Sequence, residues 1–185
     1  MKPNRVKTGH NKIGFLFLSL VVFVAACTTE TTQRDASVSV AETVDVFERT
    51  CLASFPNFSN FSALAQSAGF KPFSAGSRLK EAYQVPGKRL VVGLTEAPSG
   101  VACFLSSDSE EDPQTLGQAM LNATKRKTRT TTKKAFPTSF FEYAVQLSNG
   151  SLLVHDLREK RSADRNIFSF TGPVTEQQAR VLIYN

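Results

Sequence analysis

The first amphipathic segment of the chain follows residue 38 and has the periodicity of an α-helix. Its apolar side chains recur three or four positions apart and share one face: Val40, Val44, Phe47 and Cys51. Ser39 and Glu42 have the spacing of a capping box, which marks a helix N-terminus. Proline disfavours helical geometry in the residue before it, so the Phe55-Pro56 pair ends the segment. We predict a helix from Val40 to Ala53.

A second helix is predicted from Ser59 to Ala68, with Gly69 at the left-handed position that closes many helices. The two helices would form an αα-hairpin. The phenylalanines around it would suit a ligand groove, but their spacing favours packing in the core: Phe55, Phe58, Phe61, Phe70 and Phe73.

Strand-like runs begin near residue 89. Arg89 to Thr95 and Val101 to Ser106 are rich in β-formers, and the turn residues Glu96 to Gly100 between them predict a hairpin. Cys103 lies on its second strand, on the face that would meet the first helix. The preceding stretch, Lys71 to Lys88, is rich in Pro, Gly, Ser and Lys, so it is interpreted as a loop with a short strand around Tyr83.

A third helix is predicted from Pro113 to Asn122, since Asp112 suits the N-cap position and proline suits the first turn. Four acids crowd its start: Asp108, Glu110, Glu111 and Asp112. Oxygen ligands at this density would suit a hard divalent cation. The spacing is not that of an EF-hand, however, and acids at a helix N-terminus interact well with its dipole, so we favour the capping role.

The last third of the chain is dominated by strands. Apolar and polar residues alternate from Phe141 to Ser148, and Asn149-Gly150 predicts a type I′ turn. Leu152 to Leu157 and Asn166 to Thr171 are further predicted strands. Thr175 and Gln178 could cap a short last helix through Ile183, although Ala179 to Tyr184 fits a strand nearly as well.

These elements predict an α+β fold. Helices and hairpins are segregated along the chain, which disfavours a parallel sheet. We expect two layers, in which an antiparallel sheet of about five strands packs helices on one face.

The N-terminal segment has a different character. Four basic residues precede an apolar run from Ile13 to Val24: Lys2, Arg5, Lys7 and Lys12. A transmembrane helix needs about 20 apolar residues, and this run is shorter, so a permanent span is the weaker interpretation. The basic and apolar regions are those of an export signal.

The apolar run closes on Val24-Ala25-Ala26-Cys27, which resembles the lipobox of bacterial lipoproteins. In that family signal peptidase II cuts before the cysteine, whose sulfur carries a diacylglyceryl group and whose amino group is commonly acylated. The alternative is an ordinary secretory signal with a chance cysteine. The resemblance implies a signal peptide at residues 1–26, a lipidated N-terminus and flexible tether at 27–37, and a single α+β domain at 38–185.

The same resemblance implies attachment to a membrane through Cys27, on the periplasmic side of the cell envelope. In this family an Asp directly after the cysteine favours retention at the inner membrane. The residue at that position here is Thr28, so we expect the protein to be anchored in the outer membrane. The rest of the chain broadly resembles small lipoproteins of Gram-negative bacteria, which have a helix cysteine paired with a strand cysteine. That likeness implies no activity.

With Cys27 acylated, Cys51 and Cys103 remain. Two cysteines in an oxidising compartment predict one disulfide, which would place their Cα atoms within about 7 Å of each other. The alternative is a pair of buried free thiols that pack as small hydrophobic groups.

The net charge of the mature domain indicates which class of partner it could bind. The formal net charge is +6, but four of the 22 basic residues and none of the 16 acidic ones precede Cys27, which leaves the mature domain near balance. This small excess and the expected compartment argue against nucleic acid.

The remaining cations are concentrated between residues 125 and 134, in a segment without acids: Lys125, Arg126, Lys127, Arg129, Lys133 and Lys134. Such a run repels itself, so we expect it to be mobile and solvated. It is a candidate surface for anionic lipid head groups, another anionic envelope component or an acidic protein. The alternative is a helix C-terminus followed by a soluble loop.

Candidate chemistry beyond this surface is weak. His155 is the only histidine after Cys27, and the serines and Asp156 near it lack the pattern of a catalytic triad, so we favour a packed histidine. No motif predicts a metal or another cofactor. We therefore expect a non-enzymatic binding or structural role in the cell envelope. The alternatives are a hydrolase of an envelope polymer that uses His155 or the Asp108 to Asp112 acids, and an inhibitor of a foreign hydrolase that presents a protruding loop.

Overall fold

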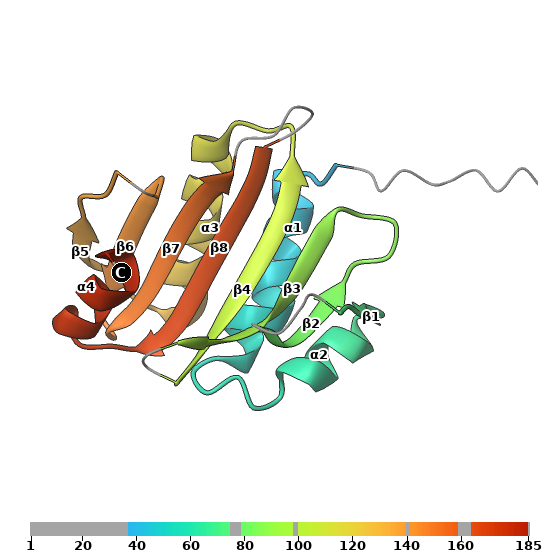
Figure 1. The fold of residues 1–185 in the computed structure, drawn as a ribbon, viewed down its shortest axis with the longest axis horizontal. Coiled ribbons are helices and arrows are strands. Elements are labelled where there is room, and N and C mark those ends of the chain that lie inside the picture. The colour runs from blue at the N-terminus through green and yellow to red at the C-terminus, as the bar shows by residue number, and fades with distance from the viewer. Residues whose placement is uncertain (1–36, 75–78, 98–99, 140, 159–163, 185) are drawn as a thin grey trace, which may run out of the picture. The chain divides into compact units, whose positions relative to one another are not determined.

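The strands of the described residues form one antiparallel sheet of eight, in the order β1-β2-β3-β4-β8-β7-β6-β5. In this computed structural model (Figure 1) the described residues are 37–74, 79–97, 100–139, 141–158 and 164–184. The predicted signal peptide, Cys27 and nearly all of the tether lie outside them. The strands are β1 (Lys71–Pro72), β2 (Leu79–Gln84), β3 (Leu90–Ala97), β4 (Gly100–Ser109), β5 (Thr132–Phe136), β6 (Tyr143–Leu147), β7 (Ser151–Arg158) and β8 (Asp164–Pro173).

The α+β class and the antiparallel pairing are confirmed, but the prediction of about five strands is wrong. The short strand predicted around Tyr83 is present as β2, and the predicted loop around it also contains β1. β5 begins within the basic segment, where charge conceals the strand signal. β1 and β5 are polar because they are the two edges of the sheet, and solvent-facing edges of natural sheets are often charged or contain proline.

Of the four α-helices in the described residues, three cover one face of the sheet (Figure 1). These are α1 (Val40–Phe47), which continues as the π-helical turn η1 (Glu48–Leu52), α2 (Phe61–Ser67) and α3 (Pro113–Thr128). Their apolar residues form one core with side chains of the sheet that include Val92, Leu105, Leu153, Phe168 and Phe170. This core holds most of the buried apolar surface, which is the main driving force for folding.

The fourth helix, α4 (Glu176–Tyr184), lies on the opposite face, so the prediction of helices on one face is wrong. Its residues Ala179 and Ile183 pack in a second cluster with Ala144 and Val154. Val145, next to Ala144, belongs to the first core, and neighbouring residues of a strand point to opposite faces. The alternation of apolar and polar residues therefore coincides, within β6, with two buried faces.

The face of the sheet on which α4 lies is not covered by a described helix over β2, β3, β4 and β8 (Figure 1). We call this the open face of the sheet. Its side chains include Val91, Phe104, Ser106 and Ile167, all of which are partly exposed.

The start of α1 matches its prediction. Ser39 accepts a hydrogen bond from the amide of Glu42, and the Glu42 carboxylate accepts one from the amide of Ser39. These bonds satisfy amides that have no partner within the helix. Thr175 and Gln178 exchange the same pair of bonds at the start of α4, so the helix prediction is confirmed there and the strand alternative is wrong.

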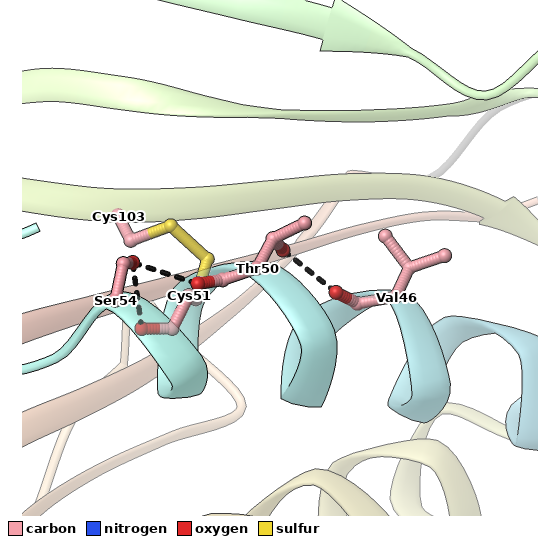
Figure 2. Close-up of a disulfide and its surroundings, with 5 residues drawn as sticks. All are labelled: Val46, Thr50, Cys51, Ser54 and Cys103. Carbon is pink, nitrogen blue, oxygen red and sulfur yellow. Dashed lines mark hydrogen bonds between the residues drawn. A yellow bond between two sulfur atoms is a disulfide. The ribbon is translucent and has the colours of Figure 1, made fainter. Parts of the chain in front are cut away.

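The buried side of α1 and η1 is more polar than the hydrophobic pattern indicates. Thr50 and Ser54 are almost completely buried, and their hydroxyls donate to the carbonyls of Val46 and Thr50, at 2.6 and 2.7 Å (Figure 2). A hydroxyl that bonds to its own helix leaves no unsatisfied polar atom. Polar residues can therefore lie in the core here.

The predicted disulfide is present (Figure 2). Cys51 of η1 is bonded to Cys103 of β4, their Cα atoms are 5.6 Å apart, and each residue is completely buried. The bond fixes the first helical segment to the middle of the sheet.

Two turns differ from their predictions. Ala97 pairs directly with Gly100, so the first hairpin is tighter than expected, and its tip, 98–99, lies outside the described residues. At the second turn Gly150 has a φ of 87° and donates to the carbonyl of Leu147. This is a three-residue loop, where we expected a two-residue type I′ turn. Asn149 instead accepts a hydrogen bond from the amide of Ser151.

The basic segment is not a mobile loop. α3 extends to Thr128, beyond its predicted end at Asn122, and Arg129 closes it in a left-handed conformation with a φ of 53°. Ala123 and Thr124 are buried, which explains the extension. The cations of the last turn interact favourably with the carbonyl end of the helix.

Candidate functional site

The open face holds a cavity of about 470 Å³. Its apolar wall is formed by Phe73, Leu79, Val91 and Phe104, and its polar wall includes Arg89, Asp108 and Arg165. Pockets for small ligands commonly measure about 300–1,000 Å³ and combine an apolar lining with a few polar groups. This cavity is the candidate binding site.

Gly93 shapes the floor of the cavity. It pairs across the sheet with Phe104, and a Cβ atom at Gly93 would lie 2.6 Å from the Phe104 ring and 2.4 Å from the carbonyl oxygen of Glu81. A side chain of any size would displace the ring or the strand. Glycine therefore lets the Phe104 ring lie across β3, where it forms part of the wall.

A buried carboxylate lies at the polar end. Asp108 accepts a hydrogen bond from Nε of Arg165 at 2.9 Å, and Arg89 Nη1 is 3.9 Å from its second oxygen. The side chain of Asp108 is 6% exposed, whereas those of Arg89 and Arg165 are 38% and 43% exposed. A buried carboxylate needs such partners, since an unpaired charge is costly to bury. Two guanidinium groups are thus held at the cavity by one acid.

Arg89 and Arg165 were not singled out from the sequence, and Asp108 was assigned to the acids at a helix start. Asp108 and Arg165 are neighbours because β4 pairs with β8, although they are 57 positions apart in the chain. No local pattern reports such a pairing. The available signal was a charged residue just after the strand predicted from Val101 to Ser106, since a buried charge usually has a partner.

The other acids of the predicted cluster do not join Asp108. Asp112 caps α3 as predicted, and the hydrogen bonds from the amide and hydroxyl of Thr115 lower the pKa of its carboxyl. Glu110 and Glu111 are exposed. Among the described residues, no group of three or more His, Cys, Asp or Glu side chains could hold a metal ion.

The predicted basic surface is divided between the two faces of the sheet. Arg126 pairs with Glu48 of η1 at 2.6 Å, on the side of the first core. Lys134 of β5 pairs with Glu176 of α4, on the other side. Arg126, Lys127, Arg129 and Lys133 are exposed, and Lys125 and Lys134 are partly buried. Lys133 and Lys134 also place charge on an edge strand, which disfavours pairing with another sheet.

His155 is a packed histidine in the core. It is completely buried, stacks on the Phe168 ring with the ring centres 4.3 Å apart, and donates from Nε2 to Oδ1 of Asn166 at 2.9 Å. A Cβ atom at Gly117 of α3 would lie 3.0 Å from its Nδ1, so the helix packs directly on the ring. This environment offers no access to a substrate.

Burial lowers the pKa of His155, because removal from water penalises the charged imidazolium. The unfolded chain takes up this proton at about pH 6.5, whereas the folded protein does so only at lower pH. We therefore expect the free energy of unfolding to fall as the pH decreases from 6.5, by up to about 1.4 kcal/mol per pH unit, with no contribution above that pH.

Urea unfolding between pH 7.5 and 5 measures this dependence, with His155→Gln as the matched variant that lacks the group. The NMR titration of the His155 ring protons provides a direct readout. A titration midpoint at or above pH 6.5 in the folded protein would contradict the prediction.

None of the helices in the described ranges is both long and apolar enough to span a membrane. Comparisons with protein families, with curated proteins and with solved structures found no match. Function must accordingly be inferred from the residues of this chain.

Proposed function

We propose that this protein is a lipid-anchored domain on the periplasmic side of the cell envelope, held at the outer membrane through Cys27, and that it binds a ligand or partner without catalysing a reaction. The Cys27 segment supports the anchor, since a basic region, a short apolar run and a lipobox-like end occur together. Thr28 supports the outer membrane over the inner membrane.

The Cys51–Cys103 disulfide supports export. Disulfides persist in oxidising compartments such as the periplasm and are rare in the cytosol. Here the bond lies completely within the core, between η1 and β4. A structural bond at this position fits a domain that folds after export.

The observation that carries the binding role is the cavity on the open face, with its apolar wall and its two arginines. The hydrolase alternative depends on His155 or on the acids from Asp108 to Asp112. His155 is completely buried, and Asp108 is held by a hydrogen bond and ion pair with Arg165, so neither group is presented to a substrate as an acid or base. These geometries favour binding.

The exposed cations Lys127, Arg129 and Lys133 support a second contact, with anionic lipid head groups or another acidic component of the envelope. Among the described residues none of the three has an ion-pair partner, and each is exposed. Tethering would keep these charges close to the membrane surface, where attraction to anionic groups acts over about a Debye length.

Replacing Cys27 tests the anchor. In a Gram-negative host grown with an alkyne-bearing fatty acid, we expect the wild type to incorporate the label and to sediment with outer membranes. We expect Cys27→Ser to lose the label completely, because the acylated thiol is gone, and with it the two or more acyl chains that stable anchoring needs. Thr28→Ser is the matched control and should behave as the wild type.

Label that persists in Cys27→Ser, or a wild type that takes up none, would contradict the proposal. Labelled protein that sediments with inner membranes would retain the anchor and contradict the outer-membrane assignment.

A further inference from the structure

We propose that the cavity on the open face binds a small amphiphilic monoanion, in which a carboxylate or phosphodiester group is joined to a short apolar chain. This inference rests on the proposed function, because it names the ligand class of the same binding surface. It follows from the charge, the hydrogen-bond donors and the apolar wall of the cavity.

The charge of the described lining favours an anion. Arg89 and Arg165 share the single carboxylate of Asp108, so these three groups carry one excess positive charge. Among the described residues, Arg158 of β7 lies opposite Arg165, and it is already paired with Asp156 at 2.9 Å. A ligand with one negative charge would balance the excess, whereas a cation would be repelled.

The donors that would hold the anion are the guanidinium groups themselves. Arg165 uses Nε toward Asp108, and a guanidinium has five N–H donors in a planar fork that suits carboxylate and phosphate oxygens. Arg89, at 3.9 Å, is attracted to Asp108 at a distance too long for a hydrogen bond between these atoms. Asp108 thus orients two cations that remain partly exposed.

The rest of the cavity would hold the apolar chain. Phe104 and Val91 form the floor between the arginines and Phe73, and Phe73 is one of the most exposed large hydrophobic residues in the described chain, at 39%. An apolar group lying on these side chains would remove their surface from water. The cavity volume of about 470 Å³ suits a molecule with a short chain better than a long lipid.

Calorimetric titration tests this ligand class on the mature lipidated protein in nanodiscs of zwitterionic lipid, with the heats of empty nanodiscs subtracted. The probes are hexanoate, methyl hexyl phosphate, hexanol, hexylammonium and inorganic phosphate. We expect at least one of the two amphiphilic monoanions to bind at one site per chain, at least about tenfold more tightly than hexanol or inorganic phosphate. Hexylammonium should not bind. A difference in affinity between hexanoate and methyl hexyl phosphate would identify whether the cavity prefers a carboxylate or a phosphodiester group.

Arg89→Gln should weaken this binding at least about tenfold, since it removes a charged donor and leaves the hydrogen bond from Arg165 to Asp108 in place. Phe73→Ser should weaken binding of the amphiphilic anion without changing that of inorganic phosphate. Arg180→Gln is the matched control, because Arg180 is an exposed, ion-paired arginine of α4 outside the cavity lining, and it should change affinity less than twofold. Urea unfolding of each variant confirms that the fold is intact.

Equal affinity for hexanol and for both monoanions would overturn the inference, as would an Arg89→Gln variant that binds like Arg180→Gln. Loss of fatty-acid labelling at Cys27 is a separate result, which would contradict the anchor. Binding without labelling, or labelling without binding, therefore distinguishes failure of the anchor from failure of the ligand class.

Discussion

Removal of the Cys51–Cys103 disulfide, by the double variant Cys51→Ala and Cys103→Ala, is expected to lower the free energy of unfolding by about 4 kcal/mol. The bond joins residues 52 positions apart. A cross-link of this span restricts the unfolded chain, and the loop-entropy relation gives a loss of about 4 kcal/mol when it is removed. Because single domains are stable by only about 5–15 kcal/mol, much of the stability of the domain depends on this bond.

Urea unfolding under non-reducing conditions measures this loss. The slope of the free energy against urea should also increase, since an unfolded chain without the cross-link exposes more surface. Ser67→Ala, an exposed position on α2, is the matched control and should change stability by less than about 0.5 kcal/mol. A double variant that loses less than about 1 kcal/mol would contradict the structural role of the bond.

Gly93→Ala is expected to lower the free energy of unfolding by about 3 kcal/mol, at the upper end of overpacking effects. The new methyl group would lie 2.4 Å from the carbonyl oxygen of Glu81, and a strand backbone cannot move away as a flexible side chain can. It would also meet the Phe104 ring, at 2.6 Å. The floor of the cavity and the β2–β3 pairing should change together.

Thr95→Ala, a partly exposed position further along the same strand, separates this effect from a general weakening of β3. We expect it to cost less than about 1 kcal/mol. The crystal structure of the Gly93→Ala variant should show a displaced Phe104 ring. A variant as stable as the wild type, with Phe104 in place, would show that the β2–β3 region accommodates a side chain there.

Elements specified by nearby residues were predictable from the sequence. The capping boxes at Ser39 and Thr175 each depend on residues three positions apart, and the bonds form as the spacing indicates. The disulfide was predictable for another reason, since only Cys51 and Cys103 remain if Cys27 is acylated.

Features that depend on distant pairing were not predictable. Burial of Ala144 and Gln146 requires α4 to pack on the second face of the sheet, and alternation within β6 cannot tell a solvated face from a covered one. The Arg165–Asp108 pair likewise depends on the register of β4 against β8. The cavity is formed by several strands, so no single stretch of sequence describes it.

The mass of the mature N-terminal peptide is the decisive measurement for a domain that we propose to be lipid-anchored in the cell envelope. We expect the peptide purified from membranes to begin at Cys27, with a mass increased by a diacylglyceryl group and commonly by a further acyl chain. An uncleaved chain that begins at Met1, or a mature N-terminus without lipid, would contradict a lipid anchor at Cys27.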